Sequence, residues 1–277
     1  MNVINVSIVL YHNKKEQIKR IIRSLFLCKN LNIKLYLIDN SKNDTLKELV
    51  NIDNHRIEYI FNNMNLGYAK AHNIAIKKSI ENGILYHLVL NPDVYFNDNI
   101  LDELYIYMEK HKDVGNIIPL VKYPNKDIQY LCKLLPSPLD LIFRRFIPFK
   151  TLKNKKNDKY ELKFTGYDKI MNVPSLSGCF MFLRSDVLKE IGLFDESFFM
   201  YLEDVDLNRR IHEKYKTIFY PKVQIYHEYA KDSYKNKKLL IYHIKSAINY
   251  FNKWGWIFDK KRFKINNKII KEHKNLL

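Results

Sequence analysis

The first 120 residues alternate between short apolar runs and longer amphipathic segments, and no other feature of the chain constrains its fold as strongly. Strands are predicted at 5–12, 33–39, 56–61, 84–90 and 114–120. Helices are predicted between them at 14–28, 44–50, 67–82 and 99–111. Repeated strand–helix units of this length form a mainly parallel sheet with helices on both faces, because each parallel crossover brings a covering helix. The sequence therefore predicts an α/β fold.

The pattern is interrupted after this region and then resumes. Residues 122–172 contain several prolines and a polar, basic run, so we expect an inserted segment outside the core. A buried strand at 173–184 and a short capped helix at 185–192 restore the alternation. The remaining predicted elements are strands at 216–220 and 223–229 and a long helix at 237–256. We expect one domain at 1–230, with the insertion inside it, and a basic helical extension at 231–277.

The formal net charge of +17 is concentrated in two stretches. Residues 231–277 contain 13 Lys and Arg against three Asp and Glu, and residues 133–163 contain nine against three. Clustered basic side chains attract nucleic acid, phospholipid head groups or phosphorylated substrates, although an ordinary solvated surface remains an alternative for either stretch. The sequence has no zinc-finger, helix-turn-helix or RNA-recognition signature, so we expect no nucleic-acid partner.

The cysteines and the apolar runs indicate the cellular compartment of the protein. Cys28, Cys132 and Cys179 lack CxxC spacing, which favours a reducing compartment without a disulfide framework. The first residues do not show the pattern of a signal peptide, and no apolar run approaches the ~18 residues that a spanning helix requires. We therefore expect a cytoplasmic protein whose membrane contact, if present, is peripheral.

Three acidic residues follow a run of aromatic side chains in FFMYLEDVDLNRR, at 198–210. Apolar residues at i and i+4 predict a helix through its second half, and a carboxylate at the helix start stabilises free N–H groups by about 1 kcal/mol. Capping would account for one acid. Apolar surroundings also raise the pKa of a carboxyl group and make it a proton acceptor near neutral pH. We predict a general base at Glu203–Asp204 and a structural charge at Asp206, close to two arginines.

Further polar residues come directly after predicted strands. Tyr11, Asp39 and Asp93 lie at or just past strand ends, where sheets of this kind bind ligands. A carboxylate in the NPD tripeptide at 91–93 can hold Mg²⁺ or Mn²⁺ against a diphosphate, although this tripeptide is also an ordinary turn. His227 ends the last predicted strand and either completes such a site or is structural. The sequence contains neither GxGxxG nor GxxxxGK[ST], so phosphates would have to be neutralised in another way.

The order of these motifs resembles that of the family 2 inverting glycosyltransferases. The matching motifs are VSIVLYH, LYLIDNSKND, NNMNLGYAKAHNIAI, HLVLNPDV, VPSLSGCFMFLRSDVLKEIGLFDESFFMYLEDVDLNRRI and IFYPKVQIYHEY. The likeness covers roughly 3–121 and 173–254, and it is greatest to the rhamnosyltransferase-like branch that builds bacterial surface polysaccharides. It implies a GT-A fold, with a mixed, mainly parallel sheet flanked by helices, and a nucleoside-diphosphate sugar as donor.

The resemblance also implies roles for individual residues. In the donor-binding half, 1–121, the nucleotide would be contacted by Tyr11 against the base, Asp39 hydrogen-bonded to the base, and Asn65, Gly67, Asn73, Asn91 and Asp93. In the catalytic half, 173–230, the base would be Asp204 with Glu203 beside it, and the sugar and acceptor cleft would be lined by Ser177 and Gly178. A divalent cation, Mg²⁺ or Mn²⁺, would be held by Asp93 and His227.

The sequence departs from the family pattern at two places. The metal motif reads N-P-D rather than D-x-D, which supplies one carboxylate and leaves metal dependence open. Ala71 stands where the family usually has Gly, which indicates an altered donor pocket. The basic residues of 231–277, together with Trp254, Trp256 and Phe258, resemble an interfacial anchor for the anionic inner face of a membrane.

The predicted function is transfer of a sugar, with rhamnose as a candidate, to a hydroxyl of a lipid-linked or oligosaccharide acceptor with inversion, in bacterial surface polysaccharide synthesis. Three alternatives are weighed against it. A nucleotidyltransferase should have a glycine-rich phosphate loop after the first strand, and LYHNKKEQ has no glycine. A basic binding module without catalysis leaves the acidic cluster unexplained. A catalytically inactive scaffold does not account for the full set of acids and histidine.

Overall fold

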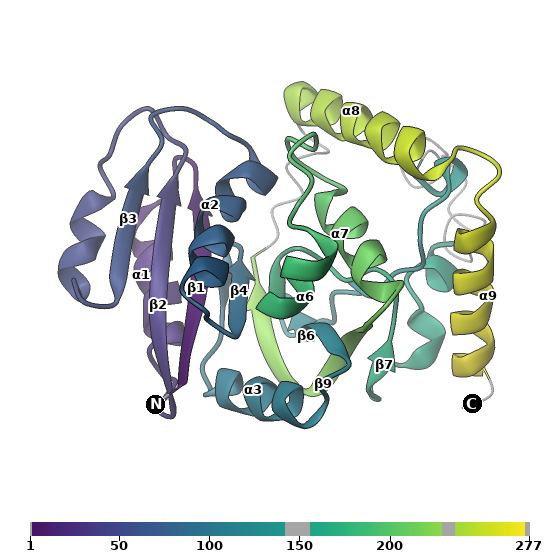
Figure 1. Cartoon of the computed structure of the whole chain (residues 1–277), viewed down its shortest axis with the longest axis horizontal. Coiled ribbons are helices and arrows are strands. Elements are labelled where there is room, and N and C mark those ends of the chain that lie inside the picture. The colour runs from purple at the N-terminus through teal and green to yellow at the C-terminus, as the bar shows by residue number, and fades with distance from the viewer. Residues whose placement is uncertain (1, 142–155, 229–235, 275–277) are drawn as a thin grey trace.

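The computed structural model describes residues 2–141, 156–228 and 236–274. A mixed sheet forms its centre, in the strand order β3-β2-β1-β4-β8-β6-β9-β5, with β7 paired to β9 (Figure 1). The strands are β1 (Asn2–Leu10), β2 (Leu31–Asp39), β3 (Ile57–Phe61), β4 (Tyr86–Leu90), β5 (Val94–Tyr95), β6 (Val114–Lys122), β7 (Met171–Asn172), β8 (Phe180–Arg184) and β9 (Lys216–His227). The pairs β1–β2, β1–β4 and β2–β3 are parallel, which confirms the predicted α/β sheet.

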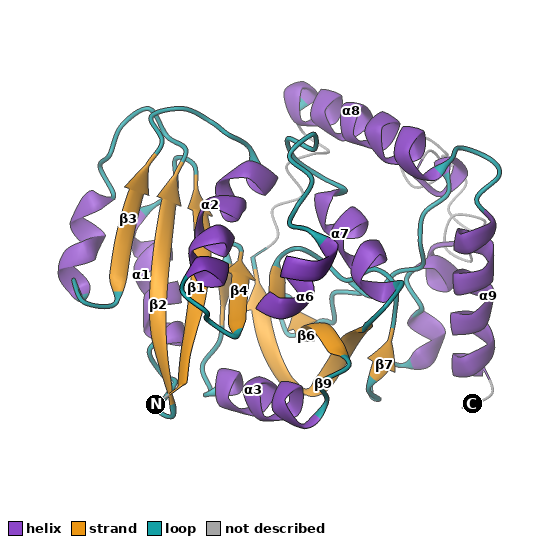
Figure 2. Cartoon of the chain, viewed as in Figure 1, coloured by secondary structure: helices purple, strands orange, loops and turns teal. Residues whose placement is uncertain are grey.

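The helices cover both faces of this sheet. In Figure 2, α2 and α6 lie in front of the strands, whereas α1 lies behind them. The helices are α1 (Lys15–Leu25), α2 (Tyr68–Glu81), α3 (Ile100–Lys110), α6 (Ser185–Ile191), α7 (Glu203–His212), α8 (Lys237–Trp254) and α9 (Lys260–Lys274), with short 3-10 helices η1 (Lys47–Ile52) and η2 (Lys163–Thr165). The helices α1, α2, α3 and α6 fall within a few residues of the ranges that apolar periodicity predicts, because the same periodicity selects the face that is buried.

Two predicted strand boundaries are wrong. Only the second half of the predicted strand at 173–184 forms a strand, β8, because the chain turns toward α7 before it, where Gly178 N–H donates to Asp204. The short strand β7 ends at Asn172, just before the predicted range. The strands predicted at 216–220 and 223–229 form one continuous strand, β9, which stays paired to β6 across a register shift after Pro119. Such an irregularity bends a strand without ending it.

The expectation that 122–172 lies outside the core is wrong for its described part. Leu134, Tyr160, Leu162 and Tyr167 are buried in the same hydrophobic cluster as Phe219 of β9. Prolines and lysines dominate the composition of the segment, but its few large apolar side chains meet the sheet, and burial of each stabilises the fold by about 1.5–3 kcal/mol. The middle of the segment, 142–155, lies outside the described residues.

The C-terminal helices pack against the rest of the fold through few but large side chains. Tyr250 and Phe251 of α8 form a cluster with Phe198 and Leu202, which immediately precede α7. Ile269 of α9 joins the main core. None of the helices in the described residues is long and apolar enough to span a membrane.

Candidate active site

A cleft of about 1820 Å³ opens at the carboxyl ends of the parallel strands. Its walls come from the loops after β1, β2 and β4, the turn at 177–179, the segment at 200–205 and the inner face of α8. Of the residues singled out in the sequence, those that line it are Tyr11, Asn65, Gly67, Asn91, Asp93, Ser177, Gly178, Glu203, Asp204 and His227. Pockets for compact ligands usually measure about 300–1,000 Å³, so this cleft can hold a nucleotide sugar together with part of a second substrate.

Asp204 is fixed by backbone hydrogen bonds from two segments. Its Oδ2 accepts from Gly178 N–H at 2.8 Å, and its Oδ1 accepts from Val205 N–H at 2.8 Å. Asp204 is the second residue of α7, so it is not the N-cap, which is Leu202. A Cβ on Gly178 would lie 3.1 Å from the Asp204 Cβ, and the glycine therefore permits the close approach of the two segments.

A strained turn directly before α7 places the start of this helix at the cleft. Tyr201 and Leu202 both have left-handed backbone conformations, with φ of 73° and 65°. Such conformations cost about 1–3 kcal/mol each in residues other than glycine, and they persist only where packing holds them. Leu202 is buried against Tyr250 and Phe251 of α8, which supplies that packing. The turn places both Glu203 and Asp204 on the cleft wall.

Burial makes Glu203 and Asp204 weaker acids than ordinary carboxylic acids. The pKa of Glu203 is raised well above its usual value, first by burial and then by the charge of Asp204. Burial also raises the pKa of Asp204, while the Gly178 N–H and the charge of Lys133 oppose that rise. Glu203 Oε2 has no hydrogen-bond partner among the described residues, which fits a neutral carboxyl group. Of the two carboxyl groups, Glu203 therefore holds its proton more firmly, and Asp204 is the one that backbone N–H groups stabilise as an anion.

A Glu203→Gln variant should be more stable than the wild type at neutral pH. The raised pKa means that the folded state binds the Glu203 proton more tightly than the unfolded state, so stability falls as pH rises from about 4 through the raised pKa. Glutamine removes this loss. We expect the melting temperature of the variant to exceed that of the wild type at pH 7–8 and to converge with it below about pH 4. A surface change, Glu81→Gln, is the matched control, and equal pH profiles for wild type and Glu203→Gln would contradict the assignment.

Tyr68 joins the two halves of the cleft. Its hydroxyl donates to the Gly178 carbonyl at 2.6 Å. Burial raises the Tyr68 pKa strongly, and the charges of Glu203, Asp204 and Asp93 raise it further. All three carboxyl groups are therefore close enough to act on one hydroxyl group. Tyr68 is not among the residues predicted from the sequence, although it follows a glycine at the start of a predicted helix.

Asp93 and His227 are brought together by strand pairing. β5 pairs antiparallel with the end of β9, and Val94 lies opposite His227. This pairing places Asp93 Oδ1 3.2 Å from His227 Nε2. Two ligands at right angles around one cation of Mg²⁺ size lie about 3 Å apart, so the separation suits shared coordination.

Gln129 sets the tautomer of this histidine. Its amide nitrogen donates to the His227 carbonyl at 2.7 Å, and its Oε1 therefore faces His227 Nδ1 at 3.0 Å. In the neutral ring Nδ1 then carries the proton, and the Nε2 lone pair faces Asp93 Oδ1. Two acceptors at this distance repel each other unless a proton on Nε2 or a metal cation lies between them, so the two side chains can form an ion pair or hold a cation together.

The protein supplies only part of a coordination sphere at this point. Among the described residues, no three His, Cys, Asp or Glu side chains are grouped so that they could hold a metal ion. Asp93 Oδ1 also accepts no hydrogen bond within that part of the chain. Mg²⁺ commonly uses one or two protein ligands and takes the rest from phosphate oxygens and water. The residues therefore fit a cation that is completed by a bound diphosphate.

Not all of the residues predicted to bind the nucleotide line the cleft. Tyr11 is half-exposed and lines the cleft. Asp39 is buried, and its two oxygens accept from Ser41 N–H at 2.8 Å and the Tyr59 hydroxyl at 2.6 Å. Its neighbour Asn40 lines the cleft instead. A contact between Asp39 and a nucleobase stays a prediction: each oxygen can still accept a second hydrogen bond, but the side chain does not line the cleft.

Two further predicted nucleotide residues serve the loop itself. Gly67 has φ of 79°, and a Cβ there would lie 2.3 Å from the Phe199 carbonyl oxygen, so only glycine fits. Asn65 Oδ1 accepts from Gly67 N–H at 2.9 Å and holds the loop at the cleft. Asn73 does not reach the cleft. Its amide donates to the Phe194 carbonyl and to Glu196, so it fastens α2 to the loop that precedes α7.

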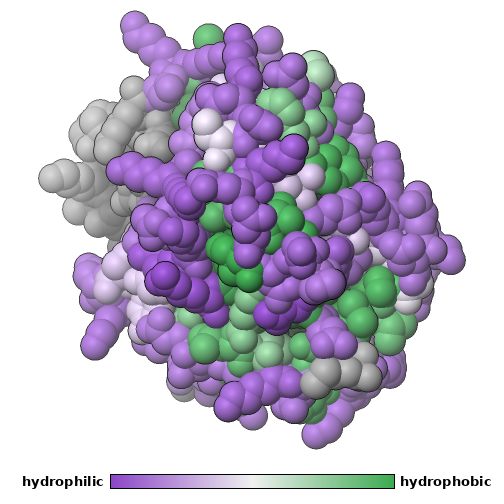
Figure 3. Space-filling view, turned by 90° about the vertical axis from the view of Figure 1, so that its left-hand side faces the viewer, coloured by the Kyte–Doolittle hydropathy of each residue, from purple (hydrophilic) through white to green (hydrophobic). Residues whose placement is uncertain are grey.

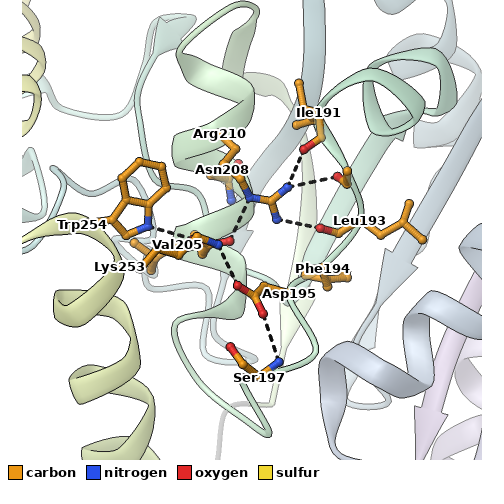
Figure 4. Close-up of polar contacts among 12 residues, drawn as sticks. Ile191, Leu193, Phe194, Asp195, Ser197, Val205, Asn208, Arg210, Lys253 and Trp254 are labelled. Carbon is orange, nitrogen blue, oxygen red and sulfur yellow. Dashed lines mark hydrogen bonds and ion pairs between the residues drawn. The ribbon is translucent and has the colours of Figure 1, made fainter.

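Asp206 is a structural charge, as the sequence predicts. It is fully buried, and it accepts from Arg210 Nε at 2.9 Å and Trp254 Nε1 at 2.8 Å, with Lys253 Nζ also at 2.9 Å. Arg210 in turn donates to backbone carbonyls of 191–193 (Figure 4). The network therefore joins α7 to α8 and to the loop after α6.

The chain is similar in sequence to known proteins. The family model described as Glycosyl transferase family 2 matches residues 7–192. A relative from Mycobacterium tuberculosis, an N-acetylglucosaminyl-diphospho-decaprenol L-rhamnosyltransferase, is 24% identical over 229 residues, which are 77% of this chain and 72% of the relative. The Haloferax volcanii low-salt glycan biosynthesis hexosyltransferase Agl10 is 26% identical over 203 residues, 73% of this chain and 60% of that protein.

Solved structures show the same fold at low sequence identity. GalNAc-T7 with UDP, GalNAc and Mn²⁺ aligns with a TM-score of 0.60 at 16% identity, over 82% of this chain and 43% of that one. S. aureus TarS 1–349 in complex with UDP aligns with a TM-score of 0.59 at 15% identity, over 99% of this chain and 72% of that one. These neighbours confirm the predicted GT-A fold.

Proposed function

The chain belongs to glycosyl transferase family 2, and we propose that it transfers a sugar, with inversion, from a nucleoside diphosphate to a hydroxyl group of a lipid-linked or oligosaccharide acceptor. The proposed context is the synthesis of a bacterial surface polysaccharide such as capsule, O-antigen or cell wall, at the cytoplasmic face of the membrane. The M. tuberculosis relative is named as a rhamnosyltransferase that acts on a diphospholipid, which supports rhamnose as the sugar and a lipid-linked acceptor.

One observation carries the proposal. A buried, anchored carboxylate, Asp204, shares a single cleft with the Asp93–His227 pair. Asp204 would accept the proton of the acceptor hydroxyl as its oxygen attacks the anomeric carbon from the side opposite the leaving diphosphate. Attack from that side inverts the configuration of the sugar. The raised pKa of Asp204 brings proton uptake closer to neutral pH than an ordinary aspartate allows.

Other residues of the cleft would bind and orient the substrates. Tyr11 would stack on the nucleobase, and Asn65 with Gly67 would hold the loop that faces the nucleotide. Neutral Glu203 would donate a hydrogen bond toward the sugar or the acceptor. A divalent cation held by Asp93 and His227 would neutralise negative charge on the diphosphate as it leaves. Ser177 and Gly178 would border the acceptor side.

A thermal-shift screen tests the donor assignment. The protein is melted with UDP-, dTDP- and GDP-sugars, each with and without Mn²⁺, and release of nucleoside diphosphate is followed for those that stabilise it. A ligand at 100 times its dissociation constant stabilises a protein by about 2.7 kcal/mol, a shift that is easily measured. If no nucleotide sugar changes the melting temperature and none is turned over, the proposed function is wrong.

The metal assignment gives a separate prediction for Asp93→Asn. The amide keeps the shape of the side chain but removes its charge, so the Mn²⁺-dependent part of the shift caused by UDP should be lost or fall at least about tenfold in apparent affinity. Binding of UDP without Mn²⁺ should change little. Asp127→Asn, in the same cleft but exposed, is the control. Equal Mn²⁺ dependence in Asp93→Asn and wild type would remove Asp93 from the metal site.

A further inference from the structure

The outward face of α8 carries an apolar stripe that the fold does not cover. Ile241, Ile244 and Ile248 recur at helical spacing and are each about half exposed. The opposite face of the same helix is buried through Ser246 and Tyr250. Residues spaced by three and four lie on one side of a helix, so the three isoleucines form a continuous line that points away from the protein.

The turn between α8 and α9 continues this apolar surface. It contains Trp256, Ile257 and Phe258, of which Ile257 is 70% exposed and Phe258 is 92% exposed. Consecutive large apolar side chains at such exposure are unusual, because soluble proteins rarely expose contiguous apolar patches without a partner. By contrast, the face at the β3 edge of the sheet is mostly hydrophilic, with hydrophobic side chains showing between polar ones (Figure 3). We call the six residues of the stripe and the turn the α8–α9 apolar surface.

Exposed lysines lie next to the residues of this surface along α8 and α9. They are Lys237, Lys238, Lys245, Lys260 and Lys264. The sequence from 237 to 264 contains one acidic residue, Asp259, which is buried and paired with Arg209. An apolar stripe bordered by lysines matches an anionic bilayer, in which acyl chains meet the apolar residues and head groups meet the cations. A protein partner of neutral or basic surface would leave the lysine charges unmatched.

The inner face of the same helix forms part of the active-site cleft. Leu239 and His243 line it, whereas Ile241 and Ile244 point outward. α8 is also fastened to α7 by Trp254 and Lys253, which contact Asp206 (Figure 4). A bilayer that contacts the outer face of α8 therefore lies one helix away from the cleft that contains Asp204.

We infer that the α8–α9 apolar surface docks the protein on an anionic lipid bilayer, with the mouth of the cleft held beside the membrane. The inference rests on the proposed function for its purpose, because a lipid-linked acceptor presents its hydroxyl group at the bilayer surface. It also corrects the anchor predicted from sequence. Trp254 points inward, lies 4.0 Å from the Arg209 guanidinium and donates to Asp206, so Ile257 and the α8 isoleucines take its place.

Vesicle co-sedimentation of the full chain tests the inference without substrates. The vesicles contain either phosphatidylcholine alone or phosphatidylcholine with phosphatidylglycerol, at low and at high salt. We expect binding to the anionic vesicles that weakens with salt, because screening shortens the range of the lysine charges. An Ile257→Ser/Phe258→Ser variant should bind at least about tenfold more weakly, since it lacks two apolar side chains that would be buried in the bilayer. An Ile241→Ser/Ile244→Ser/Ile248→Ser variant should weaken binding as well.

The matched control is Leu85→Ser/Ile106→Ser, which removes two half-exposed apolar residues from other elements. Unchanged binding in the turn variant, equal loss in the control, or no binding of the wild type to anionic vesicles would each overturn the inference. So would a dimer in sedimentation velocity that the turn variant converts to monomer, because the surface would then be a protein interface. The shifts in melting temperature caused by UDP, dTDP and GDP, each with Mn²⁺, are recorded in parallel and should be the same in all variants. Vesicle binding without any nucleotide response would refute the proposed function and leave the docking surface standing.

Discussion

An Asp204→Asn enzyme should lose about 10²–10⁴-fold in turnover while it keeps its fold and its affinity for the donor. The acceptor hydroxyl must give up its proton as it attacks, and the amide cannot take it. Asp204 also accepts N–H bonds from Gly178 and Val205, and an amide has only one oxygen to accept them. The variant should therefore lose about 0.5–1.5 kcal/mol of stability as well. That loss is far too small to explain the expected fall in rate by unfolding.

The comparison of turnover with melting temperature separates catalysis from folding. Single-turnover release of nucleoside diphosphate is measured for wild type, Asp204→Asn and Asp127→Asn, in which the changed carboxylate is exposed in the same cleft. Asp127→Asn should stay within about threefold of wild type. In the wild type the rate should rise with pH along a limb whose apparent pKa lies above that of an ordinary aspartate, because burial raises it. Wild-type turnover in folded Asp204→Asn would show that another group is the base.

An Asp259→Ala change should unfold the protein more readily than any single change in the cleft. Asp259 accepts from Arg209 Nη1 at 2.7 Å and from Nη2 at 2.9 Å, and both side chains are almost fully buried. Removal of one partner leaves an uncompensated buried charge, which costs about 3–5 kcal/mol. In a protein of this size the melting temperature should fall on the order of 10 °C. Because Arg209 lies on α7, loss of this pair also loosens the helix that carries Asp204.

Two further variants show whether the buried charge is the cause. Arg209→Met/Asp259→Leu removes both charges and keeps much of the volume, so it should recover most of the lost stability. Glu213→Ala breaks the exposed Lys261–Glu213 pair, which joins the same part of the fold to α9, and it should cost no more than about 1 kcal/mol. If the double variant is as unstable as Asp259→Ala, the effect comes from lost packing or from the Asp259 contact with Arg262 N–H.

The acidic residues predicted from the sequence to act in catalysis or metal binding all line the cleft, whereas not every predicted nucleotide-binding residue does. Glu203, Asp204 and Asp93 stand out because acids follow aromatic residues or a strand end, and all three line the cleft. Asn73 was assigned to the same cleft by its position in a motif, but it faces the loop at Phe194. A motif gives the order of residues along a helix, and the packing of that helix decides which side each residue faces.

Residues that position other side chains were harder to recognise in the sequence. Gln129 fixes the tautomer of His227, yet it lies in the segment that the sequence assigned outside the core. The role of its amide becomes clear only in the tertiary structure, which places Gln129 beside the end of β9. Ile257 was likewise missed, although the sequence did single out its neighbours Trp256 and Phe258. Trp254 was singled out with them, but in the structure it is partly buried and lies over the Arg209 guanidinium.

The sequence by itself determined the α/β alternation, the strand ends at which ligands bind and the acids that can do chemistry there, because periodicity and strand-end chemistry are local properties of the chain. Only the tertiary structure decided which of these groups meet. The β5–β9 pairing places Asp93 beside His227, and the approach of Gly178 to α7 anchors Asp204. Both are contacts between segments distant in sequence, and their geometry depends on how the whole core packs.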